Sequence, residues 1–252
     1  MEVLTICQRK GGSGKTQSAL NIGAGLHRQG KRILFVDLDS QANLSKNLRI
    51  DPEQIEYSVY DVLTGASTAD KTIVETAEGD LLPASADLAV ADLHITEKDR
   101  AYRLRKALQP VTDRYDYCIV DTPPALGICL INALMASNSA IITAEARQSS
   151  LDGIGELYGT LEAVRKANDS FTIEGILITR YKPRTVLSRD MRENLRKVAE
   201  HIGTRTFNVV IRECTAIGEA ESTRKSIFAY APRSNGAKDY SDLIAEILRG
   251  EP

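Results

Sequence analysis

Residues 8–16 read Gln8-Arg9-Lys10-Gly11-Gly12-Ser13-Gly14-Lys15-Thr16. The apolar run 3–7 before them predicts a buried strand, and apolar side chains at three- and four-residue spacing over 18–26 predict a helix. A glycine-rich turn between strand and helix can point its N–H groups at an anion, and the helix N-terminus adds positive charge. The segment therefore predicts a phosphate-binding loop in which Lys15 reaches the β- and γ-phosphates and Thr16 ligates magnesium.

The composition is that of an ordinary globular chain, with 252 residues, 42% hydrophobic and 26% charged. The net charge of −2 averages over an uneven distribution. Residues 51–99 carry 12 acidic and 2 basic side chains, whereas residues 180–238 carry 13 basic and 6 acidic ones. This contrast predicts a basic face built from the C-terminal third of the chain.

The cysteines, Cys7, Cys118, Cys129 and Cys214, form no CxxC pair. Two of them stand inside apolar runs, so we expect buried free thiols in a reducing compartment, not disulfides or a metal site. The N-terminus enters the first predicted strand directly, without a signal peptide, and no apolar run has the length of a membrane span. These features predict a cytoplasmic protein.

Strand-like and helix-like segments alternate along the chain, which predicts an α/β fold. Further strands are expected at 31–37, 117–121, 140–144, 173–179 and 207–211, with 72–76 and 80–83 as a short pair. Helices are expected near 58–64, 100–108, 128–137, 150–167, 186–200 and 234–249, and residues 38–44 as a loop. We predict a single doubly wound, mostly parallel sheet with helices on both faces, in one domain spanning residues 1–252.

Carboxylates follow two of the predicted strands. Asp37 ends the second strand and Asp39 follows it, while Asp121 ends the apolar run 117–121 and precedes Thr122-Pro123-Pro124. Ligands of open α/β sheets bind at the carboxyl ends of strands. Asp121 is therefore expected to hold magnesium directly or through water. Together with the phosphate loop, these carboxylates predict a P-loop ATPase.

The loop departs from the common Walker A motif, because Arg9 stands where a glycine is usual and Lys10 precedes the glycines. In this it resembles the deviant Walker A of the ParA/MinD (SIMIBI) family. Residues 36–43, Val-Asp-Leu-Asp-Ser-Gln-Ala-Asn, resemble the family's VDxDPQGN switch, and further similarity runs through 175–185, 207–220 and 230–237. The chain is most similar to the short, chromosomal-type ParA members, which lack an N-terminal DNA-binding extension.

The resemblance implies a slow, partner-stimulated ATP hydrolase with ATP and Mg²⁺ as cofactors. It makes Lys10, Lys15 and Asp39 the catalytic residues: Lys10 reaches the nucleotide of a second subunit, and Asp39 orients the attacking water. The implied magnesium residues are Thr16, Asp37 and Asp121. The implied nucleotide contacts are Lys10, Gly11, Gly12, Ser13, Gly14, Lys15, Thr16, Gln17 and, near the adenine, Arg212 and Glu213.

The resemblance also implies partners. They are a second copy of the chain, joined by ATP, non-specific double-stranded DNA, and a ParB-type centromere-binding protein that stimulates hydrolysis. The expected role is plasmid or chromosome partition on the nucleoid, without a membrane. The candidate DNA contacts are Lys182, Arg184, Arg189, Arg212 and Arg224, assisted by Arg192 and Arg196.

Other readings share the ATPase core. A ParA-like ATPase that positions a cargo would use the same DNA-binding cycle. A MinD-like membrane ATPase would end in a basic amphipathic helix, whereas residues 239–248 are acidic on their polar face. An iron–sulfur ATPase would need paired cysteines where Pro123-Pro124 stands. A cobyrinic-acid-type amidoligase would need a substrate-binding insertion that is not evident in the sequence.

Overall fold

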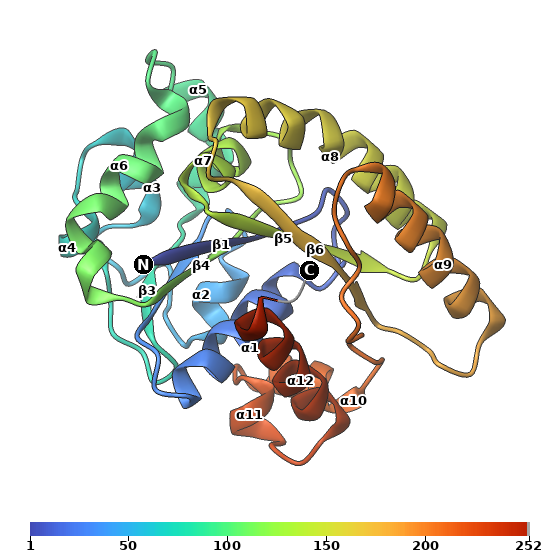
Figure 1. Ribbon diagram of the computed structural model, residues 1–252. Coiled ribbons are helices and arrows are strands. Elements are labelled where there is room, and N and C mark those ends of the chain that lie inside the picture. Colours follow the sequence, from blue (N-terminus) through green and yellow to red (C-terminus); the bar gives the residue numbers. More distant parts are fainter. Residues whose placement is uncertain (251–252) are drawn as a thin grey trace.

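Six parallel strands form one sheet in the order β3-β2-β4-β1-β5-β6 (Figure 1). The computed structural model describes residues 1–250. The strands are β1 (Glu2–Cys7), β2 (Ile33–Asp37), β3 (Asp80–Leu82), β4 (Tyr117–Asp121), β5 (Ser139–Glu145) and β6 (Thr172–Thr179). The predicted α/β class with a parallel sheet is confirmed.

The chain reverses its direction across the sheet beside β1. It runs from β1 to β2 and β3, returns to β4, and then passes β1 to form β5 and β6. Asp121 at the end of β4 pairs in register with Ile6 of β1 and with Asp37 of β2. The carboxyl ends of the three central strands therefore meet at the reversal point, where open α/β sheets bind ligands.

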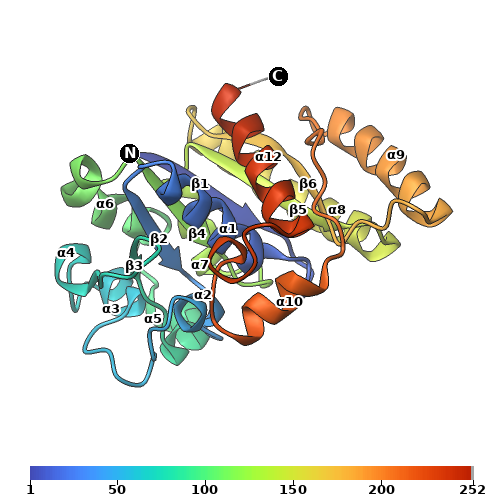
Figure 2. The same ribbon diagram turned by 90° about the horizontal axis from the view of Figure 1, so that it is seen from below.

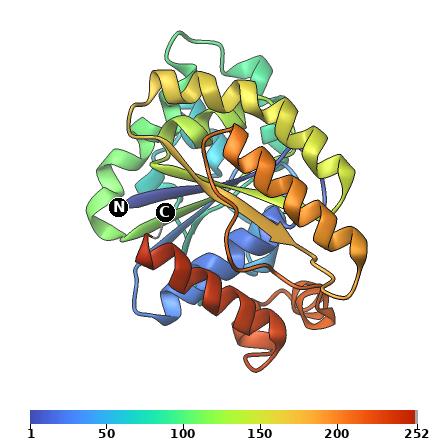
Figure 3. The same ribbon diagram turned by 45° about the vertical axis from the view of Figure 1, so that its right-hand side comes forward.

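Helices cover both faces of the sheet. They are α1 (Lys15–Arg28), α2 (Asn43–Asn47), α3 (Val59–Thr64), α4 (Ala69–Thr72), α5 (Ala91–His94), α6 (Arg103–Leu108), α7 (Ile128–Ala136), α8 (Gln148–Ala167), α9 (Val186–His201), α10 (Thr215–Ser222), α11 (Ile227–Tyr230) and α12 (Asn235–Arg249). Three 3₁₀ turns add Ala86–Val90, Arg100–Tyr102 and Gln109–Arg114. Figure 2 looks onto the face with α1, α11 and α12, and Figure 3 shows α9 beside α8 near β6.

The alternation of side chains along the strands divides the core. Leu4 and Ile6 of β1 pack with α1 and α12, whereas Val3 packs with α3, α6 and α7 on the opposite face. Helix α1 lies very close to β2, because a Cβ built on Gly23 would stand 2.2 Å from the Phe35 ring. The two apolar layers hold the central strands rigidly behind the loop that follows β1.

The predicted strand 207–211 is wrong. Only isolated bridges join this segment to β6 and its end, from Thr206 to Ile176 and from Arg212 to Tyr181. Between the bridges, the N–H groups of Asn208 and Val209 donate to the carboxylate of Glu246 in α12, at 2.9 and 3.0 Å. The side chain of a distant helix thus takes the hydrogen bonds that a strand would have used.

Three smaller predictions differ from the structure. Val74 makes a single antiparallel bridge to Leu81, whereas β3 pairs in parallel with β2, so 72–76 and 80–83 are not a strand pair. The predicted loop 38–44 already contains the start of α2. The predicted helix 100–108 begins as a 3₁₀ turn before α6.

Candidate nucleotide site

The turn between β1 and α1 is wound by glycines. Gly12 and Gly14 have φ angles of 74° and 86°, in the left-handed region that glycine enters without steric cost. Gly14 is the N-cap of α1, and its carbonyl accepts from the N–H of Ser18 at 2.9 Å. The turn therefore delivers the N-terminal end of a 14-residue helix to its concave side, as a phosphate site requires.

Two neighbouring strands hold this loop. The Ser13 hydroxyl is 3.0 Å from the hydroxyl of Thr143 in β5, and the Thr179 hydroxyl at the end of β6 donates to the Ser13 carbonyl at 2.9 Å. Upstream, the amide of Gln8 donates to the Thr143 carbonyl at 3.0 Å. A loop pinned at both ends loses little entropy when an anion binds.

Lys15 lies inside the loop. Its side chain is buried, and Nζ donates to the Lys10 carbonyl at 3.2 Å. Burial lowers the pKa of Lys15, while Asp121 and Asp39 oppose that shift. A desolvated ammonium that keeps only one hydrogen bond in the loop can exchange it for phosphate oxygens.

Two buried carboxylates, Asp37 and Asp121, end β2 and β4. The Thr16 hydroxyl donates to Oδ2 of Asp121 at 2.6 Å, and Oδ2 of Asp37 accepts from both the N–H and the hydroxyl of Ser45 at 2.8 Å. Both carboxylates are fully buried, which raises the pKa of each. A cation would stabilise their ionised forms, and a hydroxyl with two carboxylates is an oxygen donor set that suits Mg²⁺.

Residues 1–250 hold no group of three or more His, Cys, Asp or Glu side chains arranged as a metal cage. Magnesium seldom uses such a cage, since it keeps waters and phosphate oxygens and takes one or two carboxylates from the protein. Thr16, Asp37 and Asp121 fit that pattern. They could hold the ion only together with a nucleotide.

Asp39 lines a cleft of about 470 Å³ that runs in front of the glycine loop. Its Oδ1 accepts from the N–H of Gln41 at 3.0 Å, and its own N–H donates to Oδ1 of Asp37 at 3.1 Å. Pro123 and Pro124 line the same cleft. Asp39 is thus turned toward the space in which a γ-phosphate and a water would lie.

Lys10 points away from its own loop. Its Nζ donates to the Ser149 hydroxyl at 2.6 Å and lies 3.8 Å from the carboxylate of Glu145. Glu145 is buried at the end of β5 and also pairs with Arg147 at 3.2 Å and with Arg180 at 3.3 Å. Sequence reasoning missed Glu145, although a carboxylate at the carboxyl end of a strand is the signal that identified Asp37 and Asp121.

A second cleft of about 860 Å³ continues from the first. The two share the lining residues Gly14, Gln17, Arg180 and Glu221. The second also contains Arg212 and Glu213, which were predicted near the adenine. Gln17 is 9% exposed, and its side-chain amide nitrogen, Nε2, has no hydrogen-bond partner within residues 1–250. A buried amide donor at the junction of the clefts is suited to a nucleotide.

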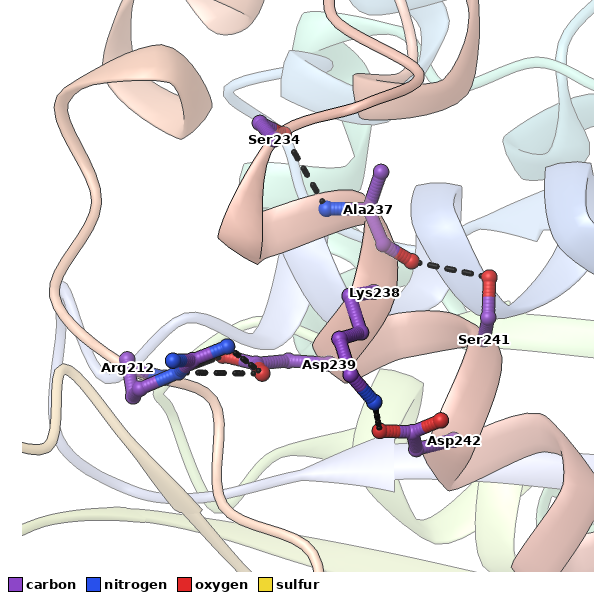
Figure 4. A network of polar contacts seen from close by, with 7 residues as sticks. All are labelled: Arg212, Ser234, Ala237, Lys238, Asp239, Ser241 and Asp242. Carbon is purple, nitrogen blue, oxygen red and sulfur yellow. Dashed lines mark hydrogen bonds and ion pairs between the residues drawn. The ribbon is translucent and has the colours of Figure 1, made fainter.

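Arg212 is held within the chain (Figure 4). Its guanidinium nitrogens lie 2.6–3.1 Å from both carboxylate oxygens of Asp239 in α12, and its backbone N–H also donates to that carboxylate at 3.0 Å. The hydrogen bond to Asp239 raises the pKa of Arg212. In this geometry the guanidinium buttresses the wall of the second cleft, and its charge is already neutralised. Its two predicted roles, at the adenine and on DNA, stay predictions.

The other predicted DNA residues fall into two places. Lys182, Arg184 and Arg189 are exposed on the loop after β6 and the first turn of α9, where Lys182 pairs with Glu213 at 2.9 Å. Arg192 donates to the Asn208 carbonyl at 3.0 Å, and Arg196 is exposed further along α9. Arg224 is apart from them, beyond the end of α10.

The thiols are free, and Cys7, Cys118 and Cys129 are buried, whereas Cys214 is half-buried and lines the second cleft. Burial raises the pKa of the Cys7 thiol to about 12. None of the helices described over residues 1–250 combines the length and apolar composition that a membrane crossing demands.

Comparisons with known proteins identify the family. Residues 1–173 match a family model described as an AAA domain. The chain is 38% identical over 250 residues to the sporulation initiation inhibitor protein Soj of Bacillus subtilis, covering 98% of each. It is 33% identical over 257 residues to the chromosome partitioning protein ParA of Caulobacter vibrioides, covering 100% of this chain and 95% of the relative.

A solved structure from Mycobacterium smegmatis superposes with a TM-score of 0.86 at 32% identity, covering 99% of this chain and 94% of that one. It is described as a cobyrinic acid a,c-diamide synthase with bound ADP and magnesium. The likeness thus extends from the glycine loop through the whole sheet and its helices. Relatives at this identity over their full length show that the chain belongs to the ParA/MinD family of P-loop ATPases.

Proposed function

We propose that the protein is a magnesium-dependent partition ATPase, in which ATP joins two subunits into a dimer that binds DNA without sequence preference. The observation that carries the proposal is the position of Lys10. Its ammonium lies on Ser149 beside Glu145, outside its own phosphate loop. A lysine in that position can leave for the phosphates of a second subunit, and ATP then becomes part of the dimer interface.

Each chain contributes its own phosphate site to this scheme. Lys15 and the N–H groups of residues 11–16 hold the phosphates, while Thr16, Asp37 and Asp121 hold magnesium, which neutralises charge as the γ-phosphate leaves. Asp39, which lines the same cleft as the phosphate loop, orients the attacking water. Phosphoryl transfer depends mainly on positioning and charge neutralisation, so this set suffices for slow hydrolysis.

DNA binding follows from the basic segment after β6. A single subunit offers a modest number of cations there, and a dimer doubles them. Since phosphate contacts add in log affinity, binding becomes steep in dimer formation. Hydrolysis would release the dimer from DNA, so the rate of hydrolysis sets how long the dimer stays bound. A ParB-type partner that stimulates hydrolysis would shorten this time. These features agree with the similarity to the chromosome partitioning protein ParA of Caulobacter vibrioides.

The deciding experiment measures binding to non-specific duplex DNA with ATP and magnesium, with ADP, and without nucleotide, across a range of salt. We expect tight binding with ATP alone and a log–log salt slope of roughly −5 for about 6 released counterions. Equal DNA affinity under all three nucleotide conditions, or affinity independent of salt, would contradict the proposed ATP-dependent binding to DNA. Light scattering should show a dimer with ATP for the parent chain and a monomer for Lys10→Ala.

The similarity to a protein described as a cobyrinic acid a,c-diamide synthase supports one second candidate, an ATP-dependent amidation of a carboxylate. That activity would make ATP hydrolysis depend on a small carboxylic acid and an amide donor, and leave it indifferent to DNA. Hydrolysis measured with each addition separates the two candidates.

A further inference from the structure

A third, smaller pocket is lined by residues at the end of α2 and in the turn from α10 to α11. Its volume is about 290 Å³. Its polar lining comes from three separate stretches of chain: Asn47 and Arg49, Thr76 and Glu78, and Arg224 and Lys225. It shares no lining residue with either nucleotide cleft.

The charge around this pocket is positive. It has three cations, Arg49, Arg224 and Lys225, against the one carboxylate of Glu78. One oxygen of Glu78 is already occupied, since it accepts from the Ser226 hydroxyl at 2.6 Å. Within residues 1–250, no carboxylate forms an ion pair with any of the three cations. They therefore remain available to an anion.

Asn47 supplies a donor that points to a ligand independently of the charges. The residue is 7% exposed, and its side-chain Nδ2 is buried without a hydrogen-bond partner among the residues described. A buried amide donor without an acceptor is costly. Asn47 lines the cationic pocket, and an anionic oxygen that reached Nδ2 would supply the missing acceptor.

The two arginines stand at matching places in the fold. Arg49 follows the end of α2 with a φ of 65°, and Arg224 follows the end of α10 with a φ of 54°. In each case the next N–H closes the helix end with a bond five residues back, Ile50 to Ser45 and Lys225 to Ala220, both at 3.0 Å. Glycine is favoured at such a left-handed position. The chain nevertheless has an arginine at both.

The partial negative charges at the C-termini of α2 and α10 reduce the positive charge of the pocket but do not cancel it. Each helix C-terminus contributes about half a negative charge at most, and α2 is short. Three cations and one carboxylate leave two positive charges, so about one remains after both helix ends are included. The Arg49 Nε also donates to the Arg224 carbonyl at 3.3 Å, which takes up one of the exposed carbonyls.

We propose that this pocket holds one phosphate group of the DNA backbone. It has the donors that a phosphate uses, guanidinium, ammonium and amide, and Arg49 and Arg224 are exposed, so a phosphodiester attached to a duplex can reach it. The inference rests on the DNA binding proposed above and adds a second contact region, which shares no residue with the loop that carries Arg184. A free phosphate ion would satisfy the same donors, and the experiment distinguishes it.

The test is Arg224→Gly in the full chain, compared with the parent by DNA affinity at several salt concentrations with ATP. Glycine suits the left-handed backbone there, so the melting temperature should be equal or higher and a loss of binding cannot be ascribed to unfolding. Loss of one phosphate contact from each subunit should reduce the salt slope by about 1.8, which is about 30-fold in affinity at 0.15 M salt. Arg49→Gly should lose affinity in the same direction.

The matched control is Arg105→Ala, which removes an exposed arginine of α6 and should leave affinity and slope unchanged. The direct readout is the side-chain amide signal of Asn47 in ¹⁵N–¹H spectra, identified with Asn47→Leu and titrated with a duplex or with inorganic phosphate. A signal that moves with the duplex in the parent and not in Arg224→Gly supports the proposal.

Parental affinity and slope in Arg224→Gly would overturn it, and a signal that moves only with inorganic phosphate would identify a free anion as the occupant. Failure of the parent chain to bind DNA with ATP would instead refute the proposed function. The two failures are therefore distinguishable.

Discussion

The phosphate loop and the segment after β6 lie at the same edge of the sheet but are held in different ways. Ser13 in the loop is fully buried and bonded to β5 and β6. By contrast, Arg184 and Arg189 are exposed, and Val186 and Leu187 between them are each 62% exposed. A pinned, buried loop suits a ligand of fixed shape, whereas exposed cations on long side chains suit a polyanion recognised by charge alone.

The largest effect should come from the buried side of this comparison. Lys15→Ala removes about two charge-assisted hydrogen bonds to phosphate, each worth about 1.5–3 kcal/mol, so we expect nucleotide affinity to fall by about 10²–10⁴. Titration calorimetry with Mg-ATP measures it. Lys10→Ala is the matched control, because its ammonium lies outside the loop and monomeric binding should persist. Comparable losses in both variants would contradict the separate roles of the two lysines.

Asp39→Ala should uncouple binding from hydrolysis. The carboxylate lines the phosphate cleft and its side chain is 3.0 Å from the Gln41 N–H, so its loss removes a group that orients water and leaves Lys15 and its loop in place. We expect hydrolysis to fall by about 10²-fold while the ATP dimer persists. Phosphate release gives the rate, and light scattering follows the dimer. Hydrolysis at the parental rate would remove Asp39 from the mechanism.

The two regions also differ in how far the sequence predicts them. The strand, glycine turn and helix of the phosphate loop are one contiguous segment, and Asp37 and Asp121 each end an apolar run. Local pattern therefore located the carboxyl edge of the sheet. The helices α1, α8, α9 and α12 were predicted for the same reason.

What the pattern missed depends on partners far along the chain. Glu246 interrupts the expected strand 207–211, and Asp239 binds Arg212 from 27 residues away. Lys10 meets Ser149 across 139 residues. Such contacts follow from how helices pack on the sheet, which spacing within one segment does not report. For this reason the basic residues could be named from the sequence, but their ion pairs could not.

Arg184→Glu tests the exposed side of the comparison. Each subunit loses one phosphate contact and gains a repelling charge, so a dimer should lose at least about 30-fold in DNA affinity at 0.15 M salt. Mobility shifts at increasing salt with ATP measure the loss. Arg105→Glu, the same reversal on α6, is the control and should bind as the parent does. An equal loss in both would indicate that net charge, and not the segment after β6, governs binding.

The smallest expected effect is a difference in the rate of thiol labelling between two cysteines of the same chain, one beside the phosphate loop and one in the second cleft. Cys7 ends the buried strand that leads into the phosphate loop, and burial raises its pKa to about 12, so very little of it is thiolate at pH 8. Cys214 is half-buried and lines the second cleft. Iodoacetamide should therefore modify Cys214 and leave Cys7 unmodified, as mass spectrometry of the peptides would record.

If the second cleft holds the base, Mg-ATP should slow the labelling of Cys214 several-fold, and Cys214→Ser should abolish the signal. Labelling of Cys214 at the same rate with and without nucleotide would place the base elsewhere, and rapid labelling of Cys7 would mean that the phosphate loop opens far more than its hydrogen bonds to Thr143 and Thr179 imply.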